Sequence, residues 1–183
     1  MKVTDAILQI DNLFSEQLIE RIIKYINKVE LKPLNVSGGL YLNIRNVEGR
    51  TLNKNSNMSE RILFCYIAQE INKILVNYTA KFKFIELIKI CQVDLLQYSP
   101  GGKYETHIDE GPTSFRRLSC IINLNNDYEG GDLNFYDMKY ENVIKTIKMK
   151  KGTTVFFPSN FLYPHKIEPI TKGKRYSIVA WLI

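Results

Sequence analysis

Residues 98–111 read YSPGGKYETHIDEG, and they contain His107, one of only two histidines among the 183 residues of the chain. The Ser-Pro-Gly-Gly segment at 99–102 is a turn signal, and the following residues 103–109 suit an extended strand. In a strand, side chains two positions apart point to the same face, so His107 and Asp109 project into one volume. An imidazole and a carboxylate placed side by side form the beginning of a metal site.

Around this stretch, from about Leu87 to the C-terminus, the sequence is a succession of short apolar or alternating runs separated by turn signals. The turn signals are SPGG, EGP, NNDYEGG, KKG and TKG. Runs of this length with such separators predict seven or eight short strands. The runs are LIKICQVDLLQY, KYETHID, RRLSCIINLN, GDLNFYD, NVIKTIKM, GTTVFF, PHKIEPI and RYSIVAWLI.

The N-terminal half has the apolar periodicity of helices instead. Ser15 is predicted to cap a helix over residues 16–29 that ends before Pro33. Ser59 is predicted to cap a second helix over residues 60–82. Its apolar face should be buried and consists of Ile62, Leu63, Tyr66, Ile67, Ile71, Ile74, Leu75 and Tyr78. The polar segment 34–57, rich in Gly and Asn, should form a strand or two and loops.

Two helices followed by a series of strands predict a mainly β fold with flanking helices, an antiparallel sandwich or barrel buttressed on one face. We expect a double-stranded β-helix (jelly roll) supported by two N-terminal α-helices. A mass of 21.3 kDa suits one domain over residues 1–183, with helical support over about 1–85 and a jelly-roll core over about 86–183.

Composition narrows the class of protein. Hydrophobic residues at 45% and charged residues at 24% are typical of globular chains. The charge of +6 comes from scattered lysines, which favours a solvated basic surface over a nucleic-acid site. Three cysteines in apolar contexts, Cys65, Cys91 and Cys120, are expected to be buried reduced thiols. The N-terminus does not read as a secretory signal and no run suits a membrane span, so a cytoplasmic location is expected.

The second histidine, His165 in FLYPHKI, follows His107 by 56 residues, and a jelly roll can bring two such distant strands together. Two histidines and one carboxylate on one face of a metal form the facial triad typical of non-haem Fe(II) oxygenases. Ten residues later, Arg175 and Ser177 share one face of an otherwise apolar strand. This pair is suited to hold a carboxylate through a charge-assisted contact and a hydroxyl hydrogen bond.

With these motifs in this order, the chain resembles the Fe(II)- and 2-oxoglutarate-dependent oxygenases, in particular their prolyl 4-hydroxylase-like branch. The resemblance covers about Leu95 to Leu182. It implies that His107, Asp109 and His165 bind Fe(II). It also implies that Arg175, assisted by Ser177, binds the distal carboxylate of 2-oxoglutarate.

The resemblance also places two further side chains at the cosubstrate. Tyr98 occupies the position of a phenol that contacts it, with a core tyrosine as the alternative. Asn123 stands where many relatives have a tyrosine or another polar contact, so the shorter amide would reach the carboxylate directly or through water. Leu133 is expected in the pocket wall, and Trp181 in the core.

By this resemblance the reaction is hydroxylation of a C–H bond using O₂, with ascorbate as an accessory reductant. The leading substrate is a prolyl or other residue of a peptide or protein, and a free amino acid or small metabolite is the alternative. Arg45 is interpreted as a surface arginine, or else as an anchor for a substrate backbone. Nucleic-acid demethylation is disfavoured, because alkylation-repair oxygenases usually carry a second arginine where this chain has Trp181. A noncatalytic metal-binding jelly roll is the remaining hypothesis.

Overall fold

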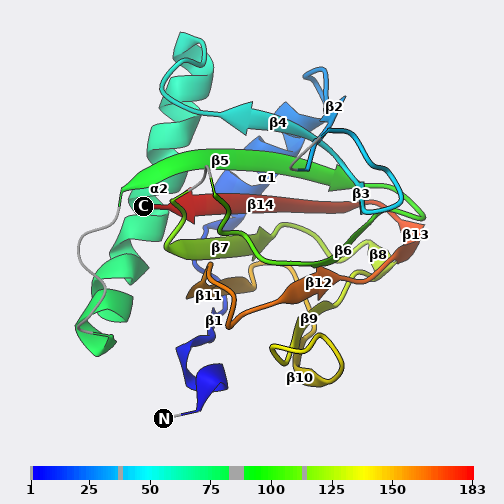
Figure 1. The fold of residues 1–183 in the computed structure, drawn as a ribbon. Coiled ribbons are helices and arrows are strands. Elements are labelled where there is room, and N and C mark those ends of the chain that lie inside the picture. The colour runs from blue at the N-terminus through cyan, green and yellow to red at the C-terminus, as the bar shows by residue number, and fades with distance from the viewer. Residues whose placement is uncertain (1, 37–38, 83–88, 113–114) are drawn as a thin grey trace.

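The computed structural model describes residues 2–36, 39–82, 89–112 and 115–183. Its helical elements all lie in the N-terminal half (Figure 1). They are a 3-10 turn, η1 (Val3–Ala6), and two α-helices, α1 (Glu16–Ile26) and α2 (Met58–Lys81). The rest of the described chain is mainly β, as predicted.

The strands of the described residues form two facing antiparallel sheets and a small ribbon. The large sheet has the order β1 (Leu8–Ile10), β11 (Thr154–Pro158), β7 (Leu118–Asn123), β14 (Arg175–Leu182), β5 (Ile90–Tyr98), β4 (Glu48–Leu52) and β2 (Lys32–Pro33). The small sheet has the order β10 (Val143–Ile147), β9 (Leu133–Tyr136), β12 (His165–Ile167), β6 (Lys103–His107) and β3 (Arg45–Asn46). The ribbon pairs β13 (Ile170–Gly173) with β8 (Tyr128–Gly130).

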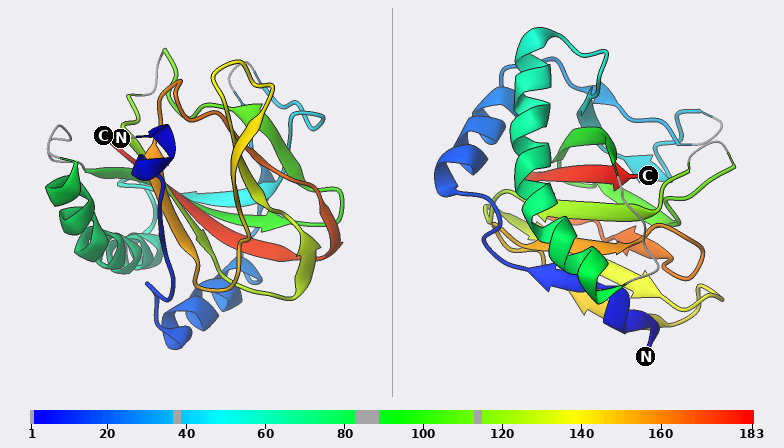
Figure 2. Two further views of the ribbon diagram at one scale, coloured as in Figure 1. Left: turned by 90° about the horizontal axis from the view of Figure 1, so that it is seen from below. Right: turned by 90° about the vertical axis from the view of Figure 1, so that its left-hand side faces the viewer.

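Alternation along the central strands separates two hydrophobic cores. On β14, Ile178 and Ala180 face one core, and Val179 and Trp181 face the other. The first core lies between the large sheet and the helices, which contribute residues such as Ile22 and Ile71. The second core lies between the two sheets. Figure 2 shows both helices on the same side of the sandwich, where they cover the large sheet.

The helix ends differ from the predicted ones. Ser15 caps α1 by accepting a hydrogen bond from the backbone nitrogen of Leu18, but the helix ends at Ile26, before Val29. For α2, the predicted cap Ser59 is wrong. Asn57 is the N-cap, and it forms a capping box with Glu60, which lies three residues on and is itself buried.

Two further expectations are wrong at α2. Ile62 and Tyr66 are exposed, at 51% and 55%, because the side of α2 that faces the sheet is the one carrying Ile67, Ile71, Leu75 and Tyr78. Cys65 is exposed too, whereas Cys91 is partly buried and Cys120 fully buried. All three thiols are free.

Some expectations lie outside the described residues. The expected boundary between helical support and jelly-roll core, at 85/86, falls within residues 83–88. Residues 37–38, within the polar segment 34–57, and residues 113–114, shortly after the predicted metal pair, are also outside the description. Of the helices that are described, none combines the length and apolar character needed to cross a membrane.

Candidate active site

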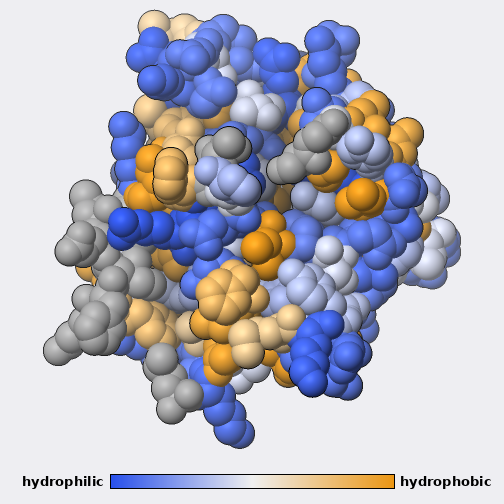
Figure 3. All heavy atoms as spheres, viewed as in Figure 1, coloured by the Kyte–Doolittle hydropathy of each residue, from blue (hydrophilic) through white to orange (hydrophobic). Residues whose placement is uncertain are grey.

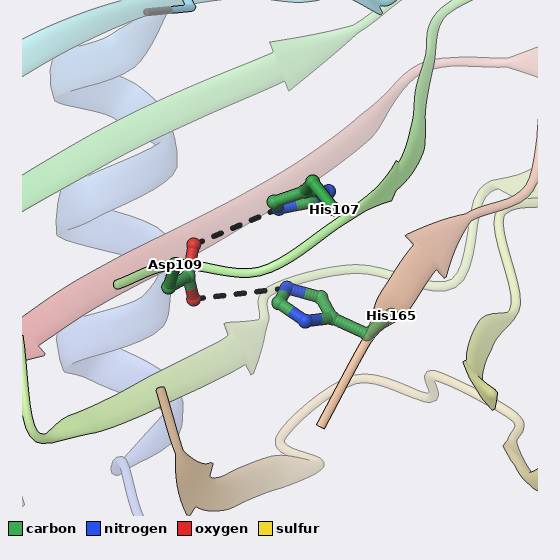
Figure 4. A group of neighbouring side chains, drawn as sticks. All are labelled: His107, Asp109 and His165. Carbon is green, nitrogen blue, oxygen red and sulfur yellow. Dashed lines mark ion pairs between the residues drawn. The ribbon is translucent and has the colours of Figure 1, made fainter. Parts of the chain in front are cut away.

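The two histidines come from neighbouring strands of the small sheet. His107 is the last residue of β6 and His165 the first of β12, and the two are direct partners in the antiparallel register. Asp109 follows β6 by two residues and turns its carboxylate toward both rings (Figure 4). The ligand atoms that these three residues offer lie within 4.8 Å of one another, so the expected convergence is observed.

Hydrogen bonds orient both imidazoles. Nδ1 of His107 lies 2.8 Å from the carbonyl oxygen of Glu105, and Nδ1 of His165 lies 3.1 Å from that of Tyr163. A carbonyl only accepts, so each Nδ1 carries the proton and each Nε2 keeps a free lone pair. The Nε2 atoms lie 3.6 Å from Oδ1 and from Oδ2 of Asp109, respectively. Two imidazole lone pairs and one carboxylate therefore point into a shared space.

The protonation states favour a metal as well. Burial lowers the pKa of His165 to about 4, assisted by the nearby His107 ring, so His165 is neutral at physiological pH. Burial alone would raise the pKa of Asp109. The imidazoles of His165 and His107 and the Ser119 hydroxyl outweigh this effect and hold the pKa well below its usual range. A neutral imidazole and an ionised carboxylate are the forms that bind metal ions.

Aromatic rings fix the two imidazoles from the side. Tyr104 stacks on His107, with ring centroids 3.5 Å apart and an angle of 16° between the planes. Phe157, from β11 of the large sheet, meets His165 edge-on at 4.7 Å. The two rings are therefore held by packing as well as by hydrogen bonds, as a precise ligand set requires.

A cavity between the sheets begins at these residues. The large sheet supplies one wall through β5, β7 and β14, and the small sheet supplies the other. Its lining residues are Arg45, Leu96, Tyr98, Tyr104, His107, Asp109, Ile121, His165, Ile167, Arg175, Ser177, Val179 and Trp181. The wall combines aliphatic and aromatic side chains with six charged or polar ones, and convergent polar groups in a partly apolar cavity are typical of a small-molecule site.

Buried donors without partners occur on the lining residues. Among the described residues, the buried side-chain nitrogen and oxygen atoms that lack a hydrogen-bond partner are Nε of Arg45, Nη2 of Arg175, Oγ of Ser177 and Nε1 of Trp181. All four belong to residues that line the cavity. Because an unpaired buried polar group costs about 1–3 kcal/mol, four such groups around one space indicate a ligand that carries acceptors.

Arg175 is the strongest of these donors. It is fully buried and takes part in none of the ion pairs found within the described part of the chain. Its guanidinium carbon lies 5.2 Å from the centre of the Tyr98 ring, and Ser177 lies two positions further along β14, on the same face. A buried, uncompensated guanidinium is costly, so this end of the cavity suits an anionic group.

Of the other two residues expected at the cosubstrate, Tyr98 lines the cavity and Asn123 does not. Tyr98 is buried and lines the cavity, and burial raises the pKa of its phenol, so the group remains a neutral donor. Asn123 lies behind Arg175 and is not among the lining residues. Its Oδ1 accepts a 2.9 Å hydrogen bond from Nε of Arg175.

The sequence did not place three of the lining residues, Arg45, Trp181 and Tyr104, in the cavity. Arg45 is not on the surface but 93% buried, 3.8 Å from Asp94, with its guanidinium over the Tyr104 ring. Trp181 lines the cavity as well as belonging to the core between the sheets. Leu133, expected in the pocket wall, is fully buried in that core and is not a lining residue. Tyr104 was not singled out at all.

Comparison with known proteins decides the family. The model of the 2OG-Fe(II) oxygenase superfamily matches residues 93–183, which hold the triad, Arg175 and Ser177. Through these residues the chain belongs to the superfamily of Fe(II)- and 2-oxoglutarate-dependent oxygenases.

Relatives of this oxygenase include a PKHD-type hydroxylase of Synechococcus sp. (strain JA-2-3B'a(2-13)). It is 26% identical over 185 residues, which span 96% of this chain and 77% of that protein. Human prolyl 3-hydroxylase 2 is 37% identical over 68 residues, but the match covers only 10% of its length. The oxygenase therefore corresponds to a small part of that relative.

Solved structures share the fold of the oxygenase. A prolyl hydroxylase of Trichoplax adhaerens, in complex with a hypoxia inducible factor oxygen degradation domain peptide fragment, superposes with a TM-score of 0.79 at 17% identity, over 98% of this chain and 84% of that one. A Pseudomonas putida prolyl-4-hydroxylase gives 0.70 at 18% identity, over 98% and 96%. At these identities the likeness concerns the fold alone.

The family implies Fe(II), 2-oxoglutarate and O₂, and the residues present fit these groups. Two imidazoles and a carboxylate provide the ligand types of a facial Fe(II) site. In the lining of the same cavity, Nη2 of Arg175 and Oγ of Ser177 are buried donors that lack an acceptor among the described residues, and a cosubstrate carboxylate would satisfy both.

Proposed function

We propose that this chain is an Fe(II)- and 2-oxoglutarate-dependent dioxygenase that hydroxylates a C–H bond. The observation that carries the proposal is the placement of two complementary sets of groups in one cavity. The His-Asp-His cluster lies at one end, and the unpaired donors of Arg175 and Ser177 belong to the same lining.

Each residue has a defined task in this proposal. His107, Asp109 and His165 hold the metal, and Arg175 and Ser177 bind the distal carboxylate of 2-oxoglutarate. When bound, Fe(II) with 2-oxoglutarate and O₂ supplies the oxidising power for hydroxylation. Apolar lining residues such as Ile121, Ile167 and Val179 exclude water from the space between the two binding groups.

A prolyl or other residue of a peptide or protein is the proposed substrate. Relatives of the chain are prolyl hydroxylases, and one solved neighbour holds a peptide. Two buried cavity donors, Nε of Arg45 and Nε1 of Trp181, are not needed by the cosubstrate and suit the carbonyl oxygens of a peptide backbone. This use of Arg45 agrees with the substrate-anchoring alternative left open by the sequence.

The surface around the cavity supports the same substrate. Exposed apolar side chains occur on three segments that lead to or from cavity residues: Leu40–Leu42 before Arg45, Phe115 after Asp109, and Phe161 before His165. Figure 3 shows hydrophobic side chains near the middle of one face, surrounded by hydrophilic ones. Exposed apolar side chains on segments next to cavity residues suit a peptide that buries apolar side chains around the target residue.

The alternatives make different predictions. A free amino acid or small metabolite would leave these exposed apolar side chains without a role, and a noncatalytic metal-binding module would leave Arg175 buried without an anion. For this reason the cavity favours an enzyme that uses a cosubstrate. Ascorbate as an accessory reductant is part of the proposal but has no residue in its support.

Succinate formation tests the proposal. With Fe(II), 2-oxoglutarate, ascorbate and a library of proline-containing peptides, we expect succinate in proportion to a product 16 Da heavier than its peptide. Arg175→Ala should chiefly raise the 2-oxoglutarate concentration that is required. If succinate formation is absent, or persists unchanged in Asp109→Ala, the proposal is wrong.

A further inference from the structure

The side-chain amide of Asn123 fixes the orientation of the Arg175 guanidinium. Nε of Arg175 donates its 2.9 Å hydrogen bond to Oδ1 of Asn123, which lies at the end of β7, the strand next to β14. A guanidinium is planar and rigid, so fixing the direction of Nε fixes the directions of the remaining nitrogens as well. One of these, the buried Nη2, has no hydrogen-bond partner in the part of the chain that the structure describes.

Asn123 is itself held in one orientation. Its Nδ2 donates to the carbonyl oxygens of Asn125 at 2.7 Å and of Met149 at 3.1 Å. An amide turned by 180° would set its oxygen against both carbonyls and its NH₂ group against Nε of Arg175, which is also a donor. Since only one orientation satisfies all these groups, Oδ1 must face Arg175.

Two neighbours complete the arrangement. The Tyr128 hydroxyl lies 3.1 Å from Oδ1 of Asn123 and 2.5 Å from the carbonyl oxygen of Met149. Gly131, at φ +71°, lies against the stem of Arg175, where an added Cβ would be 3.2 Å from Cδ of Arg175. With the Tyr98 ring also beside the guanidinium, Arg175 has little freedom to turn away.

We propose that Asn123 is a positioning residue for cosubstrate binding: it aims Arg175 at the distal carboxylate and does not touch that carboxylate itself. The inference rests on the proposed function and replaces the direct contact expected from the sequence. The neutrality of the amide matters, because an acidic side chain in its place would pair with Arg175 and compete with the cosubstrate. An amide fixes the geometry and leaves the positive charge free.

A binding experiment separates this role from a purely structural one. The protein loaded with Mn(II), which replaces Fe(II) and prevents turnover, is titrated with 2-oxoglutarate by calorimetry. The fluorescence of Trp181, the only tryptophan of the chain and a cavity residue, gives a second readout. The same titration with 2-oxobutyrate, which lacks the distal carboxylate, reports the metal end of the site alone.

For Asn123→Ala we expect 2-oxoglutarate binding about tenfold weaker, the loss typical of one misdirected charge-assisted hydrogen bond. Binding of 2-oxobutyrate should stay within about twofold of wild type. In an Arg175→Ala background, Asn123→Ala should cause no further loss, because a residue that acts only through Arg175 has no effect without it.

The matched control is Asn125→Ala. Asn125 is also a buried asparagine that hydrogen-bonds backbone groups, of Lys174 and Tyr176, but among the described residues its side chain makes no hydrogen bond to the guanidinium of Arg175. Its loss should lower the melting temperature and leave 2-oxoglutarate binding unchanged. Should Asn123→Ala fail to fold, Tyr128→Phe serves instead and should weaken 2-oxoglutarate binding about two- to threefold, with 2-oxobutyrate unaffected.

Three results would overturn the inference: wild-type affinity for 2-oxoglutarate in a folded Asn123→Ala, an equal loss for both ligands, or a further loss in the Arg175→Ala background. Where Asn123→Ala does not fold, unchanged 2-oxoglutarate binding by Tyr128→Phe would likewise overturn the inference. Failure of the proposed function gives a different result, because the wild-type protein itself would then not bind 2-oxoglutarate.

Discussion

Ser119 determines how the Asp109 carboxylate is presented. Its hydroxyl donates a 2.5 Å hydrogen bond to Oδ2 of Asp109 and lies 2.8 Å from the hydroxyl of Ser159. All three residues are buried, so water cannot easily replace this contact. A partner of this kind fixes a ligating carboxylate in place, and its loss typically weakens metal binding 10- to 100-fold.

We therefore expect Ser119→Ala to bind Mn(II) at least about tenfold more weakly than wild type, as measured by equilibrium dialysis. Ser159→Ala is the control, because Ser159 contacts Ser119 and makes no hydrogen bond of its own to Asp109 among the described contacts. Equal metal affinity in wild type and Ser119→Ala would contradict this role.

His165 makes the stability of the metal-free protein depend on pH. Its pKa is about 4 in the folded protein and about 6.5 when unfolded, so between these values the unfolded chain binds a proton that the folded chain does not. Stability should therefore be full above about pH 6.5 and fall as the pH decreases toward 4. The loss is on the order of 2–3 kcal/mol.

Urea titrations between pH 4 and 7 check this expectation. In His165→Gln, which cannot take up the proton, the decline over this window should be much smaller. Asp109 adds little to the comparison above about pH 5, because its lowered pKa makes stability depend on pH only as the pH approaches and falls below the unfolded value of about 4. A wild-type protein equally stable at pH 4.5 and pH 7 would contradict the assignment of His165 as buried and neutral.

At the residue scale, the sequence predicted which side chains could bind a metal more readily than it predicted the burial and neighbours of each residue. The convergence of His107, Asp109 and His165 followed from residue type and spacing, because few other residues offer such ligands. The environment of Arg45 did not follow, because burial between sheets depends on partners such as Asp94 and Tyr104 that are distant in sequence. Asn123 was expected at the cosubstrate, and in the structure its Oδ1 accepts a hydrogen bond from Nε of Arg175.

Among the elements, β6 shows where strand alternation fails as a guide. Tyr104 and His107 are three residues apart, so regular alternation would place them on opposite faces. In the structure both line the cavity, because the pairing slips: His165 is opposite His107, but Ile167 is opposite Tyr104. This bulge places the Tyr104 ring against His107, and no sequence pattern predicted the bulge.

The strands themselves were predicted more successfully than the helix start. Runs such as LSCIIN and RYSIVAWL became β7 and β14, since their apolar character suits strands with both faces covered. At α2, Ser59 and Asn57 both have side chains that can cap a helix. The choice between them depends on Glu60, which reaches back to the backbone nitrogen of Asn57.

This capping box leads to a stability prediction for α2. Asn57→Ala removes the hydrogen bond from the backbone nitrogen of Glu60 to Oδ1 of Asn57, and should cost about 0.5–2 kcal/mol of unfolding free energy. Ser59→Ala, two residues away and exposed, should change stability by less than about 0.5 kcal/mol. Urea denaturation of the two variants measures both losses. A larger loss of unfolding free energy for Ser59→Ala than for Asn57→Ala would contradict the assignment of Asn57 as the N-cap.

On the scale of the whole molecule, the proposed site depends on both sheets. The small sheet carries the metal cluster on β6 and β12, and the large sheet carries Arg175 and Ser177 on β14. Six lysines of the described residues pair with acids, among them Lys172 with Glu129 and Lys166 with Glu105 and Glu168, and the rest take part in none of the ion pairs found there. The excess positive charge is thus dispersed, in agreement with the expected solvated surface.

The central claim is that one cavity binds a metal at the His-Asp-His cluster and a cosubstrate carboxylate at Arg175. A crystal structure of the protein grown without oxygen, with Mn(II) and 2-oxoglutarate, tests it most directly. We predict an anomalous peak between Nε2 of His107, Nε2 of His165 and the Asp109 carboxylate, with the distal carboxylate of 2-oxoglutarate on Nη2 of Arg175 and Oγ of Ser177. A metal bound elsewhere, or a 2-oxoglutarate molecule that leaves Arg175 without an acceptor, would contradict the account.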